Sequence, residues 1–133
     1  MRRLLGALCL IFFLGATAPD ETQRSPEDRA KLDSWLAGRV AGKPTRCIAP
    51  DKTRSPIGID NQTILFRDGP RIWRNDLQAG QGCSDLVGRK SLGREGNGLR
   101  ICRGERLVVV DMSTDATVGA CIIGDFVPYE KPH

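Results

Sequence analysis

Four cysteines are the residues of this sequence with the most definite chemistry: Cys47, Cys83, Cys102 and Cys121. Thiols that recur along a chain form either disulfides or a metal site, and zinc sites usually contain close C-x-x-C pairs or histidines. This sequence has no C-x-x-C pair, and its one histidine is His133, the last residue. We therefore predict two disulfides, no metal site and no cofactor.

Three pairings of these four cysteines are possible. The sequence favours Cys83 with Cys102, and Cys47 with Cys121. The first bond would close the glycine-rich segment between its two cysteines, a loop of roughly 19 residues, which the chain-entropy model values at about 3 kcal/mol. The second bond would join the first expected strand to the last one.

Three carboxylates near expected strand ends are candidates for acid–base chemistry: Glu105, Asp111 and Asp125. Two of them together could hydrolyse a glycosidic bond, for which retaining enzymes place their carboxyl groups about 5 Å apart. The competing interpretation is that all three are surface residues in turns. With no interior histidine and with oxidised cysteines, a nucleophile would lack its usual base. The sequence therefore favours no catalytic residue, and a small cell-wall glycan hydrolase is the alternative.

The segment Arg71-Ile72-Trp73-Arg74 is the candidate binding surface. Alternate side chains of a strand share a face, so Arg71 and Trp73 should point to one side and Ile72 and Arg74 to the other. An exposed tryptophan beside arginine would form a platform for sugars, peptides or a protein partner. In the other interpretation, Trp73 belongs to the core and the arginines lie at the edge of the sheet.

The N-terminus predicts export. Arg2 and Arg3 precede an apolar run from Leu4 to Ala18, and small residues end that run, which is typical of a secretory signal peptide over residues 1–18. The run is too short for a spanning helix, so we expect no membrane span after cleavage and a periplasmic or secreted protein. Pro19 beside the expected cut leaves an uncleaved anchor as the alternative.

Charge argues against nucleic acid as a partner. The whole chain has a formal net charge of +4, to which Arg2 and Arg3 contribute, so the mature part is only weakly basic. Basic residues are concentrated between Arg67 and Arg106. These are either an arginine-rich solvated surface or a weak patch for anionic polymers of the cell envelope. Nothing in the sequence defines an oligomeric state.

The remaining sequence predicts one mainly β domain over residues 25–129, after a disordered segment at 19–24 and before a frayed tail at 130–133. Ser25-Pro26 suits a helix start, and an i, i+3, i+4 apolar stripe follows at Leu32, Trp35 and Leu36. Five or six short strands are expected after the helix, at 46–49, 63–67, 71–75, 99–102, 107–110 and 121–127.

Turns and loops complete the expected fold. Asp68-Gly69 favours a hairpin turn, although Pro70 suggests a loop longer than two residues. The glycine-rich segment 80–98 is expected to be a long loop with, at most, a short helix near 84–87, and 113–119 is expected to be a second loop. An N-terminal helix followed by hairpin-connected strands predicts a small antiparallel sheet or partly open barrel, linked by disulfides.

Several short stretches occur in a fixed order along residues 46–129. They are Cys47-Ile48, the stretch 62–67, Trp73-Arg74-Asn75-x-Leu77, Cys83-x-x-Leu86, Cys102-x-Gly104-Glu105, Val109-Val110-Asp111 and the closing segment 119–129. In this order the chain resembles a family of small secreted proteobacterial proteins of unknown function. The resemblance implies export and a shared β fold, and it implies no activity. Where the family often has Gly-Asp, this chain has Gly104-Glu105, which keeps the charge.

Size, disulfides and the absence of catalytic motifs together favour a non-enzymatic binding module. We expect its partner to be an envelope protein or an anionic polymer, contacted through Arg71, Trp73 and Arg74.

Overall fold

The computed structural model describes residues 24–81, 83 and 90–133. The expected signal peptide, the segment 19–23 and the expected short helix at 84–87 lie outside these residues. The helix is α1 (Pro26–Leu36), and a 3-10 turn, η2, covers Pro50–Thr53. The strands are β1 (Val40–Ala41), β2 (Cys47–Ile48), β3 (Pro56–Gly58), β4 (Thr63–Asp68), β5 (Arg71–Asp76), β6 (Ala79–Gln81), β7 (Lys90–Arg94), β8 (Ile101–Cys102), β9 (Arg106–Asp111), β10 (Ala116–Ile122) and β11 (Phe126–Glu130).

The strands form three antiparallel sheets. Five strands pair in the order β1-β11-β5-β4-β3, four in the order β6-β10-β9-β7, and β2 pairs with β8 as a two-stranded ribbon. The predicted fold class, an N-terminal helix followed by antiparallel β structure with disulfides, is therefore confirmed. The strands described here do not close into a barrel.

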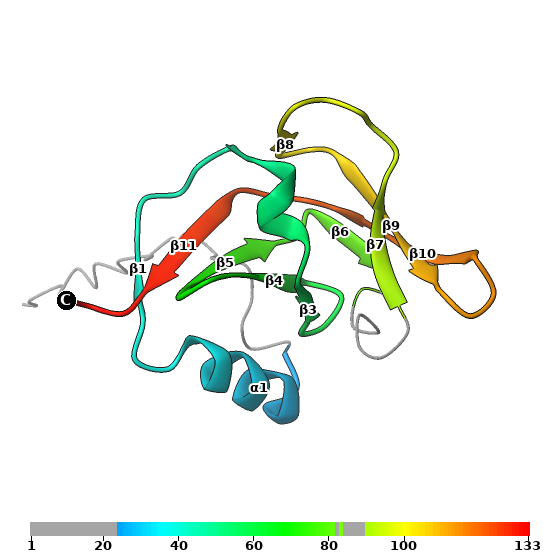
Figure 1. The fold of residues 1–133 in the computed structure, drawn as a ribbon. Coiled ribbons are helices and arrows are strands. Elements are labelled where there is room, and N and C mark those ends of the chain that lie inside the picture. Colours follow the sequence, from blue (N-terminus) through cyan, green and yellow to red (C-terminus); the bar gives the residue numbers. More distant parts are fainter. Residues whose placement is uncertain (1–23, 82, 84–89) are drawn as a thin grey trace, which may run out of the picture.

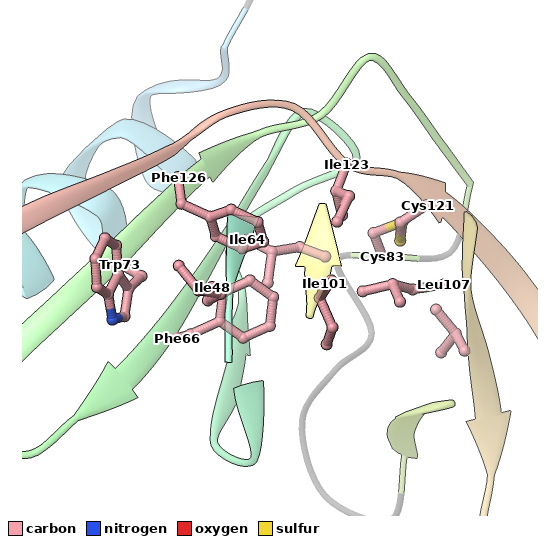
Figure 2. Close-up of a cluster of buried hydrophobic side chains, with 11 residues drawn as sticks. Ile48, Ile64, Phe66, Trp73, Cys83, Ile101, Leu107, Cys121, Ile123 and Phe126 are labelled. Carbon is pink, nitrogen blue, oxygen red and sulfur yellow. A yellow bond between two sulfur atoms is a disulfide. The ribbon is translucent and has the colours of Figure 1, made fainter. Parts of the chain in front are cut away.

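The five-stranded sheet separates two cores because its strands alternate. Ile64 and Phe66 point into the larger core, whereas Leu65 points to the opposite face. On that opposite face α1 packs through Leu32, with Trp35 beside it. Figure 1 shows α1 on one side of the sheet and β8 on the other. Figure 2 shows the larger core, in which Phe66 and Phe126 lie between Trp73 and the Cys83–Cys121 disulfide.

The start of α1 follows the sequence closely. The Ser25 side chain accepts a hydrogen bond from the Asp28 backbone N–H at 3.1 Å, and Pro26 occupies the first helical position. Both features suit a helix N-terminus because the first N–H groups have no partner within the helix. Arg24, which we expected at the end of a disordered segment, is instead buried beside the sheet, where it ion-pairs with Asp60 at 3.3 Å.

The β4–β5 hairpin closes with a two-residue turn, Gly69-Pro70. Asp68 pairs directly with Arg71, so the expectation of a longer loop is wrong, and the turn lies one residue later than Asp68-Gly69. Gly69 has φ +58°, which glycine adopts without strain at the first central position. Pro70 then occupies the second central position, where the ladder needs no N–H.

One expected strand, 121–127, is two strands. β10 ends at Ile122 and β11 begins at Phe126, because the chain bends between them at Gly124. The buried side chain of Asn75 holds this bend: its Nδ2 donates to the Gly124 carbonyl at 2.9 Å, and its Oδ1 accepts from the Gly124 N–H at 2.8 Å. One amide thus replaces the two backbone bonds of a strand pair.

Two further expectations about this end of the chain are wrong. The last strand, which was expected to end at 127, runs through Pro128 and continues to Glu130. Pro128 is tolerated because β1 has ended at this point, where Gly42 N–H still donates to the Pro128 carbonyl at 2.7 Å. The expected loop at 113–119 is shorter, since β10 begins at Ala116.

The glycine-rich segment 80–98 is not one loop. It contains the end of β6 and all of β7, which form the two outer strands of the four-stranded sheet. The strands β1 and β3 were also not expected. The run Leu107-Val108-Val109-Val110, by contrast, forms an inner strand, as predicted, because β9 lies between β10 and β7.

The disulfides are Cys47–Cys102 and Cys83–Cys121, so the favoured pairing is wrong, although all four cysteines are oxidised as expected. Cys47 and Cys102 lie opposite each other in the β2–β8 ribbon. Cys83 follows β6, which pairs with β10 around Cys121. Strand register therefore decides the pairing, and it overrides the preference for the shorter loop.

Candidate functional site

Trp73 is a core residue. It is 8% exposed and lies in the larger core beside Phe66, and Figure 2 shows its indole at one end of that core. Its Nε1 donates a hydrogen bond to Asp68 at 3.0 Å, and the guanidinium of Arg71 lies 5.1 Å from the ring centroid. This is the packing alternative of the two sequence interpretations, and it leaves no exposed indole platform.

Asp68 links the indole to two cations. Its carboxylate accepts from Trp73 and from Lys52 Nζ at 3.2 Å, while Arg71 lies nearby and ion-pairs with Glu130. Burial raises the pKa of Asp68, but the hydrogen bonds from Trp73 and Lys52 lower it by a larger amount. The net pKa of Asp68 is therefore below the ordinary value. Arg71 therefore serves an ion pair and a ring contact at this end of the sheet.

Arg74 lies on the other face of the sheet, as strand alternation predicted. Its Nε donates to Asp76 at 3.1 Å, and its Nη1 approaches the Tyr129 hydroxyl at 3.5 Å. Burial lowers the pKa of Arg74, but the Asp76 carboxylate raises it, so the net pKa lies above the ordinary value. Arg71 and Arg74 thus do not form one surface, and whether either contacts a partner stays a prediction.

Each of the three candidate carboxylates is engaged in contacts with other groups of the chain. Glu105 and Asp111 lie at opposite ends of β9, which separates them by about 20 Å at ~3.3 Å per residue. Asp111 accepts from the N–H and hydroxyl of Ser113 in the turn that follows. Asp125 ion-pairs with Arg103 at 3.0 Å. The glycan-hydrolase alternative gains no support from these positions.

Glu105 instead supports the β2–β8 ribbon. One carboxylate oxygen accepts the Cys102 N–H at 2.5 Å, and the other accepts from Arg94 at 3.1 Å. Arg94 also donates to the carbonyls of Gly98 and Arg100, which shapes the loop before β8. Glu105 therefore positions the backbone of β8, and arginines flank this strand and its partner β2.

We name this feature the arginine ribbon: β2 and β8, their disulfide, and the flanking Arg46, Arg100 and Arg103. All three arginines are exposed. Arg46 and Arg103 flank the Cys47–Cys102 pair just outside the two-pair ladder, and the Arg103 N–H donates to the Arg46 carbonyl at 2.8 Å. Like charges that face each other across neighbouring strands are destabilising.

The charges of the arginine ribbon are incompletely neutralised. Within the part of the chain that the structure describes, the Arg46 guanidinium has no hydrogen-bond or ion-pair partner, and that of Arg100 donates only to the Cys47 carbonyl at 3.4 Å. Arg103 is paired with Asp125, and both side chains are about half exposed. The ribbon therefore presents three guanidinium groups against one carboxylate.

A shallow hollow adjoins the arginine ribbon. It has a volume of about 380 Å³ and shares Arg103 and Asp125 with the ion pair just described. Asp76 and Gln78 line it from the end of β5, and Gly124 lies at the bend before β11. The end of β5 and the connection between β10 and β11 therefore meet beside the ribbon.

Sequence analysis missed Arg46, Arg100 and Arg103 as a group. The available signal was the adjacency of arginine to cysteine in Arg46-Cys47 and Cys102-Arg103. That signal required the correct cysteine pairing, since Cys47 paired with Cys121 would place these arginines apart. Arginine identity alone could not have selected them from the many in the sequence.

No family model, no curated protein and no solved structure matches this chain. Among residues 24–81, 83 and 90–133, no three histidine, cysteine or acidic side chains gather into a group able to hold a metal ion. The same residues include no helix with the length and apolar character needed to cross a membrane.

Proposed function

We propose that this chain is an exported, non-enzymatic module that binds an anionic polymer of the bacterial envelope through the arginine ribbon. The observation that carries this proposal is the unneutralised charge of Arg46 and Arg100 beside Arg103. Three like charges on so small a ribbon reduce stability unless a ligand of opposite charge neutralises them. This loss of folding stability is explained if the surface binds an anionic ligand.

Guanidinium groups fit phosphate and carboxylate groups. Each presents its N–H donors in a planar fork that can bond two anionic oxygens, and it stays charged at every physiological pH. The exposed position of Arg46 and Arg100 on a two-stranded ribbon leaves both forks accessible to an extended chain. The Cys47–Cys102 disulfide between them holds their spacing.

Two disulfides support an oxidising destination. Such bonds persist in secreted and periplasmic proteins, whereas cytosolic thiols are kept reduced. Together with the signal-peptide pattern of residues 1–18, they favour a periplasmic or secreted protein. The resemblance to secreted proteobacterial proteins then makes lipopolysaccharide, which bears phosphates, the first polymer to test.

The test is a binding titration with purified lipopolysaccharide, with polygalacturonate as a carboxylate polymer and dextran as a neutral one. Against lipopolysaccharide at 0.15 M salt, the double variant Arg46→Gln/Arg100→Gln should bind about tenfold more weakly, which corresponds to ~1.4 kcal/mol from two exposed charge contacts. Binding should weaken as salt rises, and dextran should not bind.

Arg67→Gln is the matched control because Arg67 is exposed on the helix-covered face, where its guanidinium lies 5.7 Å from the Trp35 ring centroid. It removes the same charge away from the arginine ribbon and should leave binding near wild type. Equal affinity of the double variant and wild type for every anionic polymer would contradict the proposal. If Arg67→Gln lost as much affinity as the double variant, the loss would reflect the overall charge of the protein and not the arginine ribbon.

A further inference from the structure

The two disulfides differ sharply in their access to solvent. Cys83 and Cys121 are both 0% exposed and belong to the larger core, as Figure 2 shows. Cys47 and Cys102 are half-buried on a ribbon of two residues per strand. Thiol–disulfide exchange requires direct approach of a thiolate to sulfur, so only the second bond is open to it in the folded protein.

The charges around the accessible bond favour thiolate chemistry. Arg100 donates to the Cys47 carbonyl at 3.4 Å, which places a guanidinium beside Cys47, and Arg46 precedes that cysteine. Positive charge stabilises a thiolate and attracts an anionic thiol. On the Cys102 side, Arg103 is paired with Asp125, and the Glu105 carboxylate accepts the Cys102 N–H.

We propose that Cys47–Cys102 is an exchangeable disulfide, whereas Cys83–Cys121 is a permanent one. The thiolate of an attacking thiol forms a bond to Cys102 Sγ as the Cys47–Cys102 bond breaks. The electron pair of the broken bond goes to Cys47 Sγ, which leaves as a thiolate beside Arg100. A second thiol, or the second group of a dithiol, then releases Cys102 and carries away the oxidising equivalents as a new disulfide.

Exchange at this bond would control the arginine ribbon. Once the bond is open, no covalent link joins β2 to β8, whose cysteines are 55 residues apart in sequence, and the ribbon is held by two ladder pairs and by the burial of Ile48 and Ile101. Arg46 and Arg100 then lose the covalent constraint on their spacing. This regulatory consequence rests on the proposed binding function, whereas the exchange itself does not.

The first experiment exposes the folded protein to excess reduced glutathione without denaturant. Samples are alkylated at intervals and the cysteines are identified by peptide mass. We expect Cys47–Cys102 to open at least about tenfold faster than Cys83–Cys121, and the mixed disulfide to form on Cys102. Equal rates for the two bonds, or earlier opening of Cys83–Cys121, would overturn the proposal. Glutathione on Cys47 would overturn the assigned direction of attack.

The second experiment separates charge from access. Glutathione brings an anionic thiolate, while cysteamine carries an ammonium group that offsets its thiolate. At low salt, Arg100→Gln should lower the ratio of the glutathione rate to the cysteamine rate about threefold, as expected for one exposed charge several ångströms away. Arg67→Gln should leave the ratio unchanged. If the ratio is unchanged in Arg100→Gln, the charge of Arg100 does not assist the exchange.

The third experiment measures lipopolysaccharide binding with Cys47–Cys102 intact and after selective opening and alkylation. We expect weaker binding after opening. If exchange is selective but binding does not change, the regulatory role fails and the exchange stands. If even the oxidised protein does not bind, the proposed function fails separately from the exchange.

Discussion

Replacing Asn75 with alanine should test how the bend between β10 and β11 is held. Asn75 is fully buried, and its amide makes both hydrogen bonds to the Gly124 backbone, at 2.9 and 2.8 Å. Gly124 is buried as well. Alanine removes the amide and leaves both backbone groups of Gly124 without that partner, in a space that the smaller side chain does not fill.

The magnitude follows from those two groups. A buried donor or acceptor left unsatisfied costs about 1–3 kcal/mol, so losing both partners at Gly124 should cost roughly 2–6 kcal/mol. Domains are commonly stable by about 5–15 kcal/mol. Asn75→Ala should therefore stay folded but lose a large part of its free energy of unfolding.

Urea unfolding with both disulfides intact measures this loss, followed by tryptophan fluorescence and far-ultraviolet circular dichroism. With a urea m-value of about 1–3 kcal/mol/M, a loss of about 3 kcal/mol lowers the midpoint by roughly 1–3 M. Asn97→Ala, at an exposed asparagine, should shift the free energy by no more than about 0.5 kcal/mol. If Asn75→Ala costs less than about 1 kcal/mol, the bend does not depend on the amide, and our reasoning is refuted.

Three further predictions concern local contacts. Burial raises the pKa of Asp68, but the hydrogen bonds, of which that from Trp73 is the largest, lower the net pKa below the ordinary carboxyl value. Asp68 therefore stabilises the fold at pH values above the ordinary carboxyl pKa, and this stabilisation is lost as the pH falls through the lowered pKa. Asp68→Asn should therefore lower the urea midpoint at pH 7 and make stability less dependent on pH below about 4; an unchanged acid limb would contradict this. Gly124→Ala should cost about 1–3 kcal/mol in the same urea assay, since a Cβ there would lie 2.2 Å from the Asp76 carbonyl oxygen; a wild-type midpoint would show that the bend relaxes freely. Ser25→Ala should cost about 1 kcal/mol through loss of the helix cap, seen as a lower melting temperature, and no shift would mean that packing alone holds α1.

Local patterns predicted the parts of the fold that depend on local rules. The cap at Ser25 and the apolar stripe of α1 follow from the geometry of one helix, and the alternation along 71–75 follows from the geometry of one strand. The valine run of β9 predicted an inner strand of its sheet because β-branched residues pack well on a pleated, half-buried surface. None of these predictions required knowledge of a distant partner.

Two of the errors involve distant partners. The bend at Gly124 depends on Asn75, which lies 49 residues away in sequence, so the run 121–127 looks like one strand until the two are brought together. The cysteine pairing failed in the same way, since register in the sheets joins Cys47 to Cys102. Because the arginine ribbon depends on that pairing, the candidate site could not be found either.

Trp73 illustrates how a side chain with two possible roles is decided by its environment. Sequence alternation correctly placed it on one face with Arg71, but nothing local showed that this face packs against the second sheet. Its burial leaves the arginine, and not the indole, at the surface.

Strand β4 has a consequence for how different parts of the molecule move. Its residues Thr63, Ile64, Leu65 and Phe66 are all 0% exposed, since one face of the strand meets α1 and the other meets the second sheet. Backbone amides so enclosed exchange with deuterium only when the whole domain unfolds, whereas a ribbon of two residues per strand can open locally. Ile48 and Ile101 of the arginine ribbon belong to the larger core, so local opening of the ribbon would uncover these two side chains while β4 stays enclosed.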